Sequence, residues 1–133
     1  MRQDVILGDC LEVMPQIPDK SIDMILCDLP FGTTVCKWDI IISFDKLWGQ
    51  YQKIIKNDGA IVLFGVQPFT SLLIVSNLNL FKYSLVWEKS RVCHFAQAPY
   101  RFMTIHEDIL VFSKAGTSKN AKIRMKYNPQ GLV

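Results

Sequence analysis

Residues 22–34 read Ile-Asp-Met-Ile-Leu-Cys-Asp-Leu-Pro-Phe-Gly-Thr-Thr, and this segment says most about the architecture. Its first half is a short apolar run, which predicts a buried strand ending at Asp28. Pro30 and Gly32 then force a tight loop directly after the strand. In open α/β sheets, ligands bind beyond the carboxyl ends of the strands. The sequence therefore predicts a ligand site in this loop.

The loop carries the groups that a reaction at an aromatic amine needs. The lone pair of such an amine is delocalised into the ring, so the nitrogen is a poor nucleophile. The Asp28 carboxylate and the Leu29 carbonyl could accept hydrogen bonds from the two N–H groups of the amine and draw its nitrogen toward a pyramidal geometry. Phe31 could stack on the base, a contact worth about 1–3 kcal/mol. The alternative is an ordinary turn, because Asp-x-Pro-aromatic occurs by chance in about one chain in thirty of this length.

A wider stretch carries a family resemblance. Residues 7–34, from Leu-Gly-Asp-Cys to Asp-Leu-Pro-Phe-Gly-Thr-Thr, closely resemble the amino-terminal part of the amino-group DNA methyltransferases. The resemblance continues through residues 36–39, 59–65, 86–89, 106–112 and 127–130, so it covers nearly all of the chain. It implies that S-adenosylmethionine donates the methyl group, and that the catalytic residues are Asp28, Leu29, Pro30 and Phe31.

Two features depart from the family pattern. Leu29 replaces the first Pro of the Asp/Asn/Ser-Pro-Pro-aromatic loop, but only a main-chain oxygen is needed there, and Pro30 still restricts Leu29 to extended conformations. The aromatic-x-Gly-x-Gly cofactor loop has no match, because no two glycines have that spacing. In a permuted branch of the family this loop lies at the carboxyl end. We therefore expect the amino-terminal half of a permuted methyltransferase, with 1–113 as an incomplete catalytic domain and 114–133 as a basic tail.

Asp9 and Cys10 are the other candidate cofactor residues. Asp9 ends a predicted strand at 4–7, which would open onto the same crevice as Asp28. The resemblance implies that Asp9 and Cys10, together with Asp28, contact the cofactor. Asp9 could equally cap the short helix that follows it, and both roles could hold at once.

The remaining elements alternate in type along the chain. We expect strands at 4–7, 22–27, 60–64, 81–88 and 109–112, and helices at 10–14, 44–56 and from the turn at 65–68 to residue 78. This alternation predicts an α/β fold, a partial Rossmann-like sheet that is mainly parallel and has helices on both faces. Residues 89–104 show no period and predict a working or disordered loop.

Composition narrows the class of protein. The chain has 133 residues, half of them hydrophobic, which favours one globular domain. No leader and no stretch of bilayer length is present, so we expect a soluble, cytoplasmic protein of a bacterium or phage, with no membrane partner. The four cysteines and two histidines match no common zinc spacing, and we predict no metal site.

Basic residues concentrate at the carboxyl end. The 25 residues after Asp108 contain five basic and no acidic side chains, which is typical either of a phosphate-tracking arm or of a solvated tail. Trp87 could stack on a base or pack in the core. The full set of candidate nucleic-acid residues is Trp87, Lys89, Arg91, Arg101, Lys122 and Arg124.

The function that we expect is S-adenosylmethionine-dependent methylation of adenine N6 in double-stranded DNA, with the base flipped out of the duplex. Asp rather than Ser at the start of the loop favours adenine over cytosine N4 within the resemblance. One alternative is a non-catalytic, prophage-type remnant, or a subunit that a second chain or a homodimer partner completes. Another is methylation of RNA or of a protein amide.

Overall fold

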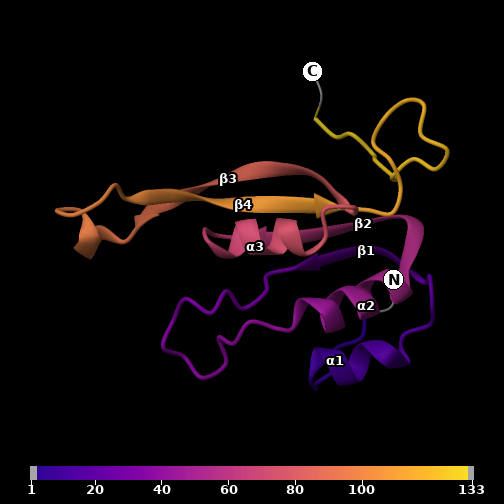
Figure 1. The fold of residues 1–133 in the computed structure, drawn as a ribbon, viewed down its shortest axis with the longest axis horizontal. Coiled ribbons are helices and arrows are strands. Elements are labelled where there is room, and N and C mark those ends of the chain that lie inside the picture. The colour runs from indigo at the N-terminus through magenta and orange to yellow at the C-terminus, as the bar shows by residue number, and fades with distance from the viewer. Residues whose placement is uncertain (1–2, 132–133) are drawn as a thin grey trace.

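The computed structural model describes residues 3–131 (Figure 1). Its elements in chain order are α1 (Cys10–Val13), the 3-10 turn η1 (Met14–Gln16), β1 (Ile22–Cys27), α2 (Phe44–Ile54), β2 (Ile55–Gly65), α3 (Phe69–Ser76), β3 (Phe81–Cys93), the 3-10 turn η2 (Phe95–Gln97) and β4 (Thr104–Phe112). The four strands form one sheet in the order β1-β2-β4-β3. The chain is therefore a small α/β domain, as predicted.

The sheet is mixed, and the prediction of a mainly parallel sheet is wrong. β1 and β2 pair in parallel, whereas β4 pairs antiparallel with both β2 and β3. A parallel pair needs a long crossover, usually a helix. Residues 94–103 contain only the single turn η2, so β3 and β4 form a hairpin and β4 inserts between β2 and β3.

β2 begins earlier than the sequence predicts. The segment Asn57-Asp58-Gly59 reads as a helix stop, but α2 already ends at Ile54 and β2 starts at Ile55. The pairing of β1 with β2 is irregular at this point. A Cβ on Gly59 would lie 2.8 Å from the carbonyl oxygen of Asp23. The glycine is therefore needed where two strands approach closely, and not to end a helix.

The structure corrects two further predictions, a strand at 4–7 and the bounds of the loop at 89–104. Residues 4–7 form no strand, and Val5 and Leu7 are fully exposed, at 99% and 102%. No strand among residues 3–131 pairs with this segment, and an extended apolar segment needs a neighbour to become a strand. The irregular stretch expected at 89–104 is shorter, at residues 94–103, because β3 continues to Cys93 and β4 begins at Thr104.

One core lies between the helices and one face of the sheet. Alternate residues of β2 and β4 point into it, and α2 and α3 supply the other side; the central members are Leu47, Trp48, Tyr51, Ile61, Leu63, Phe69, Leu73, Leu110 and Phe112. On the other face, Met24 and Leu26 of β1 are exposed at 53% and 58%, whereas Val111 of β4 is buried. Within residues 3–131 the helices thus cover one face, not both. No helix in this range has the length and apolar character to span a bilayer.

The direction of the strands separates the two ends of the sheet. β1 and β2 end at the same edge, whereas β4 runs the other way. Figure 1 accordingly shows the loop after β1 and the β3–β4 turn at one end and the carboxyl-terminal segment at the other. That segment folds back onto β2, because the Lys126 N–H donates to the Asp58 carbonyl at 2.9 Å.

Candidate active site

The loop after β1 borders a hollow of about 330 Å³. Asp28 follows the last residue of β1 and is exposed, whereas the Leu29 side chain is buried at 6% exposure. The hollow is lined by Asp28, Leu29, Pro30, Phe31, Thr33, Thr34, Trp38 and Asp39. All four residues predicted to be catalytic thus line one cavity, as a ligand site at a strand end requires. Their catalytic roles stay predictions.

Asp39 fixes the shape of this loop. Its carboxylate accepts hydrogen bonds from the backbone N–H of Gly32 at 2.8 Å and of Thr34 at 2.6 Å. Hydrogen bonds from the Thr34 side chain and from the Gly32 backbone hold the pKa of Asp39 below its ordinary value. Gly32 has φ +68°, a left-handed conformation that favours glycine. Sequence reasoning did not single out Asp39, although it lies in the 36–39 stretch that carries the resemblance.

Two aromatic rings border the hollow, and they differ in how tightly they are packed against the core. Phe31 packs against Phe69 of α3 with ring centroids 5.1 Å apart, so it is tied to the core. Trp38 is 74% exposed and lines the same hollow. Trp38 was missed as a site residue, and its indole is the freer surface for stacking on a planar ligand.

A charged cluster on β3 and β4 acts on Asp28. Partial burial and the nearby Glu107 carboxylate raise the pKa of Asp28, while the Lys89 ammonium opposes them. Lys89 and Glu107 form an ion pair, with side chains 27% and 15% exposed. The Lys89 Nζ also lies 5.9 Å from the centroid of the Trp87 ring. Glu107 was missed by sequence reasoning, because a lone acid inside a strand pattern carries no signal of its own.

Trp87 lies on the face of the sheet that the helices leave open. It is 47% exposed, and its ring meets Phe64 of β2 edge-on at 5.6 Å. This position is neither the packed core nor a free surface. Trp87 is therefore not fully buried in the core, and its stacking on a base stays a prediction.

Two of the three predicted cofactor residues, Asp9 and Cys10, border a second hollow, of about 670 Å³, whereas Asp28 lines the first one. Gly8, Asp9 and Cys10 line one side and Pro30 and Trp38 another; Ile40, Ile41 and Ile42 form an apolar wall, and Ser43 and Lys46 add polar groups. Asp9 also caps α1, since its carboxylate accepts the Leu11 N–H at 2.7 Å. One carboxylate beside an apolar wall suits a heterocyclic base with an amino group. Residues 3–131 hold no group of His, Cys, Asp and Glu side chains arranged for a metal ion.

The predicted nucleic-acid residues do not gather in one patch. The Lys89 ammonium forms an ion pair with the Glu107 carboxylate. Arg91 and Arg101 lie on the outer part of the β3–β4 hairpin. Lys122 and Arg124 belong to the carboxyl-terminal segment, at the opposite end of the sheet from Asp28 (Figure 1). The basic carboxyl-terminal segment therefore lies away from the Asp28 loop, because β4 runs to the other edge of the sheet, and its role as a phosphate contact stays a prediction.

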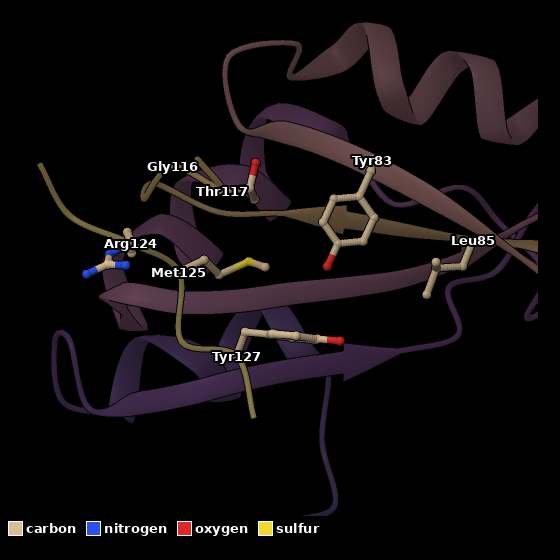
Figure 2. A pocket seen from close by; sticks show the side chains of 7 residues that line it. All are labelled: Tyr83, Leu85, Gly116, Thr117, Arg124, Met125 and Tyr127. Carbon is tan, nitrogen blue, oxygen red and sulfur yellow. The ribbon is translucent and has the colours of Figure 1, made fainter. Parts of the chain in front are cut away.

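A third hollow, of about 660 Å³, lies beside that arm. Figure 2 shows the Tyr83 and Tyr127 rings facing one space, from β3 and from the carboxyl-terminal segment, with Arg124 at the far side. No residue that lines this hollow also lines the cavity at Asp28. This hollow is therefore distinct from the cavity at Asp28.

The fold and the loop after β1 together define the class of protein: an α/β domain whose candidate site lies at the carboxyl end of a parallel strand. Solved structures of that class match the chain. They include the cytosine-N4-specific PvuII DNA methyltransferase (TM-score 0.63, 16% identity, 81% of this chain and 48% of that one). The M1.HpyAVI–SAM complex matches with TM-score 0.59 and 19% identity, over 88% of this chain and 62% of that one.

A third match is a candidate DNA modification methylase from Thermus thermophilus, complexed with S-adenosyl-L-methionine (TM-score 0.58, 18% identity, 93% of this chain and 54% of that one). No protein-family model matches the chain. The chain spans about half the length of the solved structures it matches. It therefore has the fold of part of an amino-group DNA methyltransferase, the fold shared by cytosine-N4 and adenine-N6 enzymes.

Proposed function

We propose that this chain carries the target-amine site of an S-adenosylmethionine-dependent DNA methyltransferase that acts on adenine N6. The observation that carries the proposal is the cavity after β1, where Asp28 and Leu29 meet an exposed indole, that of Trp38. A carboxylate, a constrained carbonyl and a ring in one hollow match an amino group on a planar heterocycle. The fold, shared with the DNA methyltransferases above, supports DNA as the source of that heterocycle.

In this proposal each loop residue has a separate task. Asp28 accepts one N–H of the amine, and the Leu29 carbonyl, whose backbone Pro30 restricts, accepts the other. These two acceptors localise the nitrogen lone pair. Trp38 or Phe31 holds the base by stacking, which offsets part of the few kcal/mol needed to flip it from the duplex. A raised pKa at Asp28 also makes this carboxylate a stronger acceptor.

The hollow at Asp9 and Cys10 fits the adenine end of S-adenosylmethionine. Asp9 would accept from the adenine amino group, and residues 40–42 would contact the ring. When bound, this cofactor supplies an electrophilic methyl group on a sulfonium. The hollow adjoins the Asp28 cavity, since Pro30 and Trp38 line both. The sequence offers no Gly-x-Gly loop for the methionine end.

A second candidate function takes into account that the chain fits only the adenine end of S-adenosylmethionine. The chain spans about half of the solved structures it matches, and one face of its sheet is open. A subunit that becomes active only with a second polypeptide would have these properties. The similarity to a cytosine-N4-specific enzyme keeps that base as the alternative target. A restriction–modification role in a bacterial or phage cytoplasm is consistent with either form.

The test is methyl transfer from labelled S-adenosylmethionine to DNA, RNA and protein, with the methylated nucleoside identified by mass spectrometry. The proposal expects label in DNA as N6-methyladenine, and none after Asp28→Ala. N4-methylcytosine would move the target base, and label in RNA or protein would contradict the proposal. Calorimetry with S-adenosylmethionine separates the two forms, because a subunit that lacks the methionine cradle would bind it weakly or not at all.

A further inference from the structure

The hollow beside the carboxyl-terminal segment combines two aromatic rings, apolar side chains and one cation. Its volume of about 660 Å³ lies in the range of pockets that hold small ligands. Figure 2 shows Arg124 at one end and the Tyr83 and Tyr127 rings toward the other, with Met125 between them. Among residues 3–131, no acidic residue lines this hollow. It therefore suits an elongated ligand with a flat ring at one end and an anion at the other.

The carboxyl-terminal wall of this hollow is held in place by backbone hydrogen bonds. The Gly116 N–H donates to the Ile123 carbonyl, and the Met125 N–H donates to the Gly116 carbonyl, both at 2.9 Å. The Lys126 N–H then joins the segment to the Asp58 carbonyl of β2, also at 2.9 Å. The segment thus presents its side chains to the hollow from a fixed backbone.

The cation at the end of the hollow is available to a ligand. Within the described part of the chain, the Arg124 guanidinium forms no ion pair. The 25 residues after Asp108 carry five basic and no acidic side chains, so the local potential favours an anion. A planar guanidinium binds phosphate through two parallel hydrogen bonds. Arg124 is therefore suited to a phosphate group.

The two rings supply the other half of the site. Tyr127 is 67% exposed, and Tyr83 is partly buried on β3. Neither ring packs against another aromatic ring of residues 3–131, so both are available to a planar ligand. Leu85 and Met125 add apolar surface beside them. Nucleobases stack on such tyrosine rings with little regard to their identity.

We propose that this hollow binds a nucleotide, with its base against Tyr83 and Tyr127 and its phosphate on Arg124. The site goes beyond the proposed function, because it lies at the opposite end of the sheet from Asp28 and shares no lining residue with that cavity. A free nucleotide and one unit of a single-stranded DNA offer the same chemistry, a base joined to a phosphate. Since stacking tolerates any base, the site should show little base preference.

The simpler account is that the basic segment attracts any polyanion and that the hollow has no ligand of its own. Two matched controls separate these accounts. Lys119→Gln removes the same charge from the same segment as Arg124→Gln, but Lys119 does not line the hollow. Tyr100→Leu removes a ring between β3 and β4, whereas Tyr127→Leu removes one from the hollow. All four side chains are exposed, so none of these changes removes a buried contact.

The first measurement is an NMR titration of the full chain with thymidine and with thymidylate, which adds one phosphate. Thymine has no amino group, so the result does not depend on recognition of an amine by Asp28. The wild type should bind thymidylate about tenfold more tightly than thymidine, as for hydrogen bonds between charged groups, with shifts at the amides of 116–117 and 124–127. Arg124→Gln should lose this preference, and Lys119→Gln should keep it. Tyr127→Leu should weaken the binding of both ligands, and Tyr100→Leu that of neither.

Three results would overturn the inference. They are equal binding of thymidine and thymidylate, equal losses in Arg124→Gln and Lys119→Gln, and shifts confined to other parts of the chain. A second titration, with single-stranded oligothymidylate, identifies the source of the nucleotide. Tighter binding of the strand, with a salt dependence that Arg124→Gln reduces, indicates DNA. Equal affinities for the strand and for thymidylate indicate a free nucleotide, and both results support the site.

Discussion

The carboxylate of Asp39 accepts the backbone N–H of Gly32 at 2.8 Å, and this bond fixes the loop that follows β1. Asp39 is 8% exposed, and it accepts a second N–H, from Thr34, at 2.6 Å. The loop thus receives its shape from a residue that lies seven positions further along the chain than Gly32. We expect the position of the Leu29 carbonyl in the proposed site to depend on this contact.

Asp39→Asn should loosen the loop and destabilise the chain at neutral pH, because one carboxylate oxygen acceptor becomes an amide donor. The pKa of Asp39 is lowered in the folded state, so its contribution to stability is full above pH 3.8, its ordinary value. That contribution is lost as the pH falls through the lower, folded-state pKa. Urea denaturation of both proteins across this range should show their midpoints converging in acid.

Asp19→Asn is the control for that experiment. Its ion pair with Lys53 is 3.6 Å long, and both partners are exposed, so it contributes about 0–1 kcal/mol at most. Equal losses in the Asp39 and Asp19 variants, or a loss at Asp39 that does not depend on pH, would argue against the loop-holding role.

Gly32→Ala should destabilise the chain by about 1–2 kcal/mol, the cost of a left-handed conformation for a residue with a Cβ. Gly32 has φ +68°, and a Cβ there would lie 2.9 Å from Cγ1 of Ile41. Gly49→Ala in α2 is the opposite case. A Cβ at Gly49 meets nothing within 4 Å, so this variant should gain about 0.5–1 kcal/mol. Chemical denaturation measures both, and a stabilised Gly32→Ala would contradict the strained geometry.

The sequence predicts the local elements around the site better than the sheet. The apolar run before Asp28 and the Pro30–Gly32 turn are local signals, and the structure has the strand and loop there. The sequence predicts α2 from the helical spacing of its apolar residues, and the structure buries them on one face of the helix. Strand direction is not a local property. It depends on how β3 connects to β4, and residues 89–104 gave no period to show that these strands simply turn back.

The residues of the site also divide into those that a local sequence motif marks and those that only the folded chain brings together. Asp28 and Phe31 stand in a contiguous motif, so the sequence marks them. Asp39 reaches the site through a loop, and only the folded chain brings it into one cavity with Asp28. The wrong strand at 4–7 has a related cause, since its apolar residues have the strand pattern but no neighbouring strand in the described part of the chain.

The open face of the sheet should make this chain self-associate. Met24 and Leu26 are more than half exposed on β1, which has one strand neighbour within residues 3–131. Exposed apolar strands at an edge promote pairing between copies. Met24→Lys/Leu26→Lys should therefore shift sedimentation velocity toward monomer. The matched control is Leu72→Lys/Val75→Lys on α3, residues that are similarly exposed. A wild-type monomer at all concentrations, or equal effects of both pairs, would contradict the prediction.

The most direct test of the central claim is whether the Asp28 loop recognises an exocyclic amine. Fluorescence anisotropy should be measured for two single-stranded oligonucleotides that differ only in adenine or purine at one position. The wild-type chain should prefer adenine by roughly ten- to a hundredfold, the range for a hydrogen bond to a charged group. Asp28→Ala should abolish that preference while its circular dichroism spectrum stays native. Equal binding of adenine and purine by the wild type, or an unchanged preference in Asp28→Ala, would contradict the account.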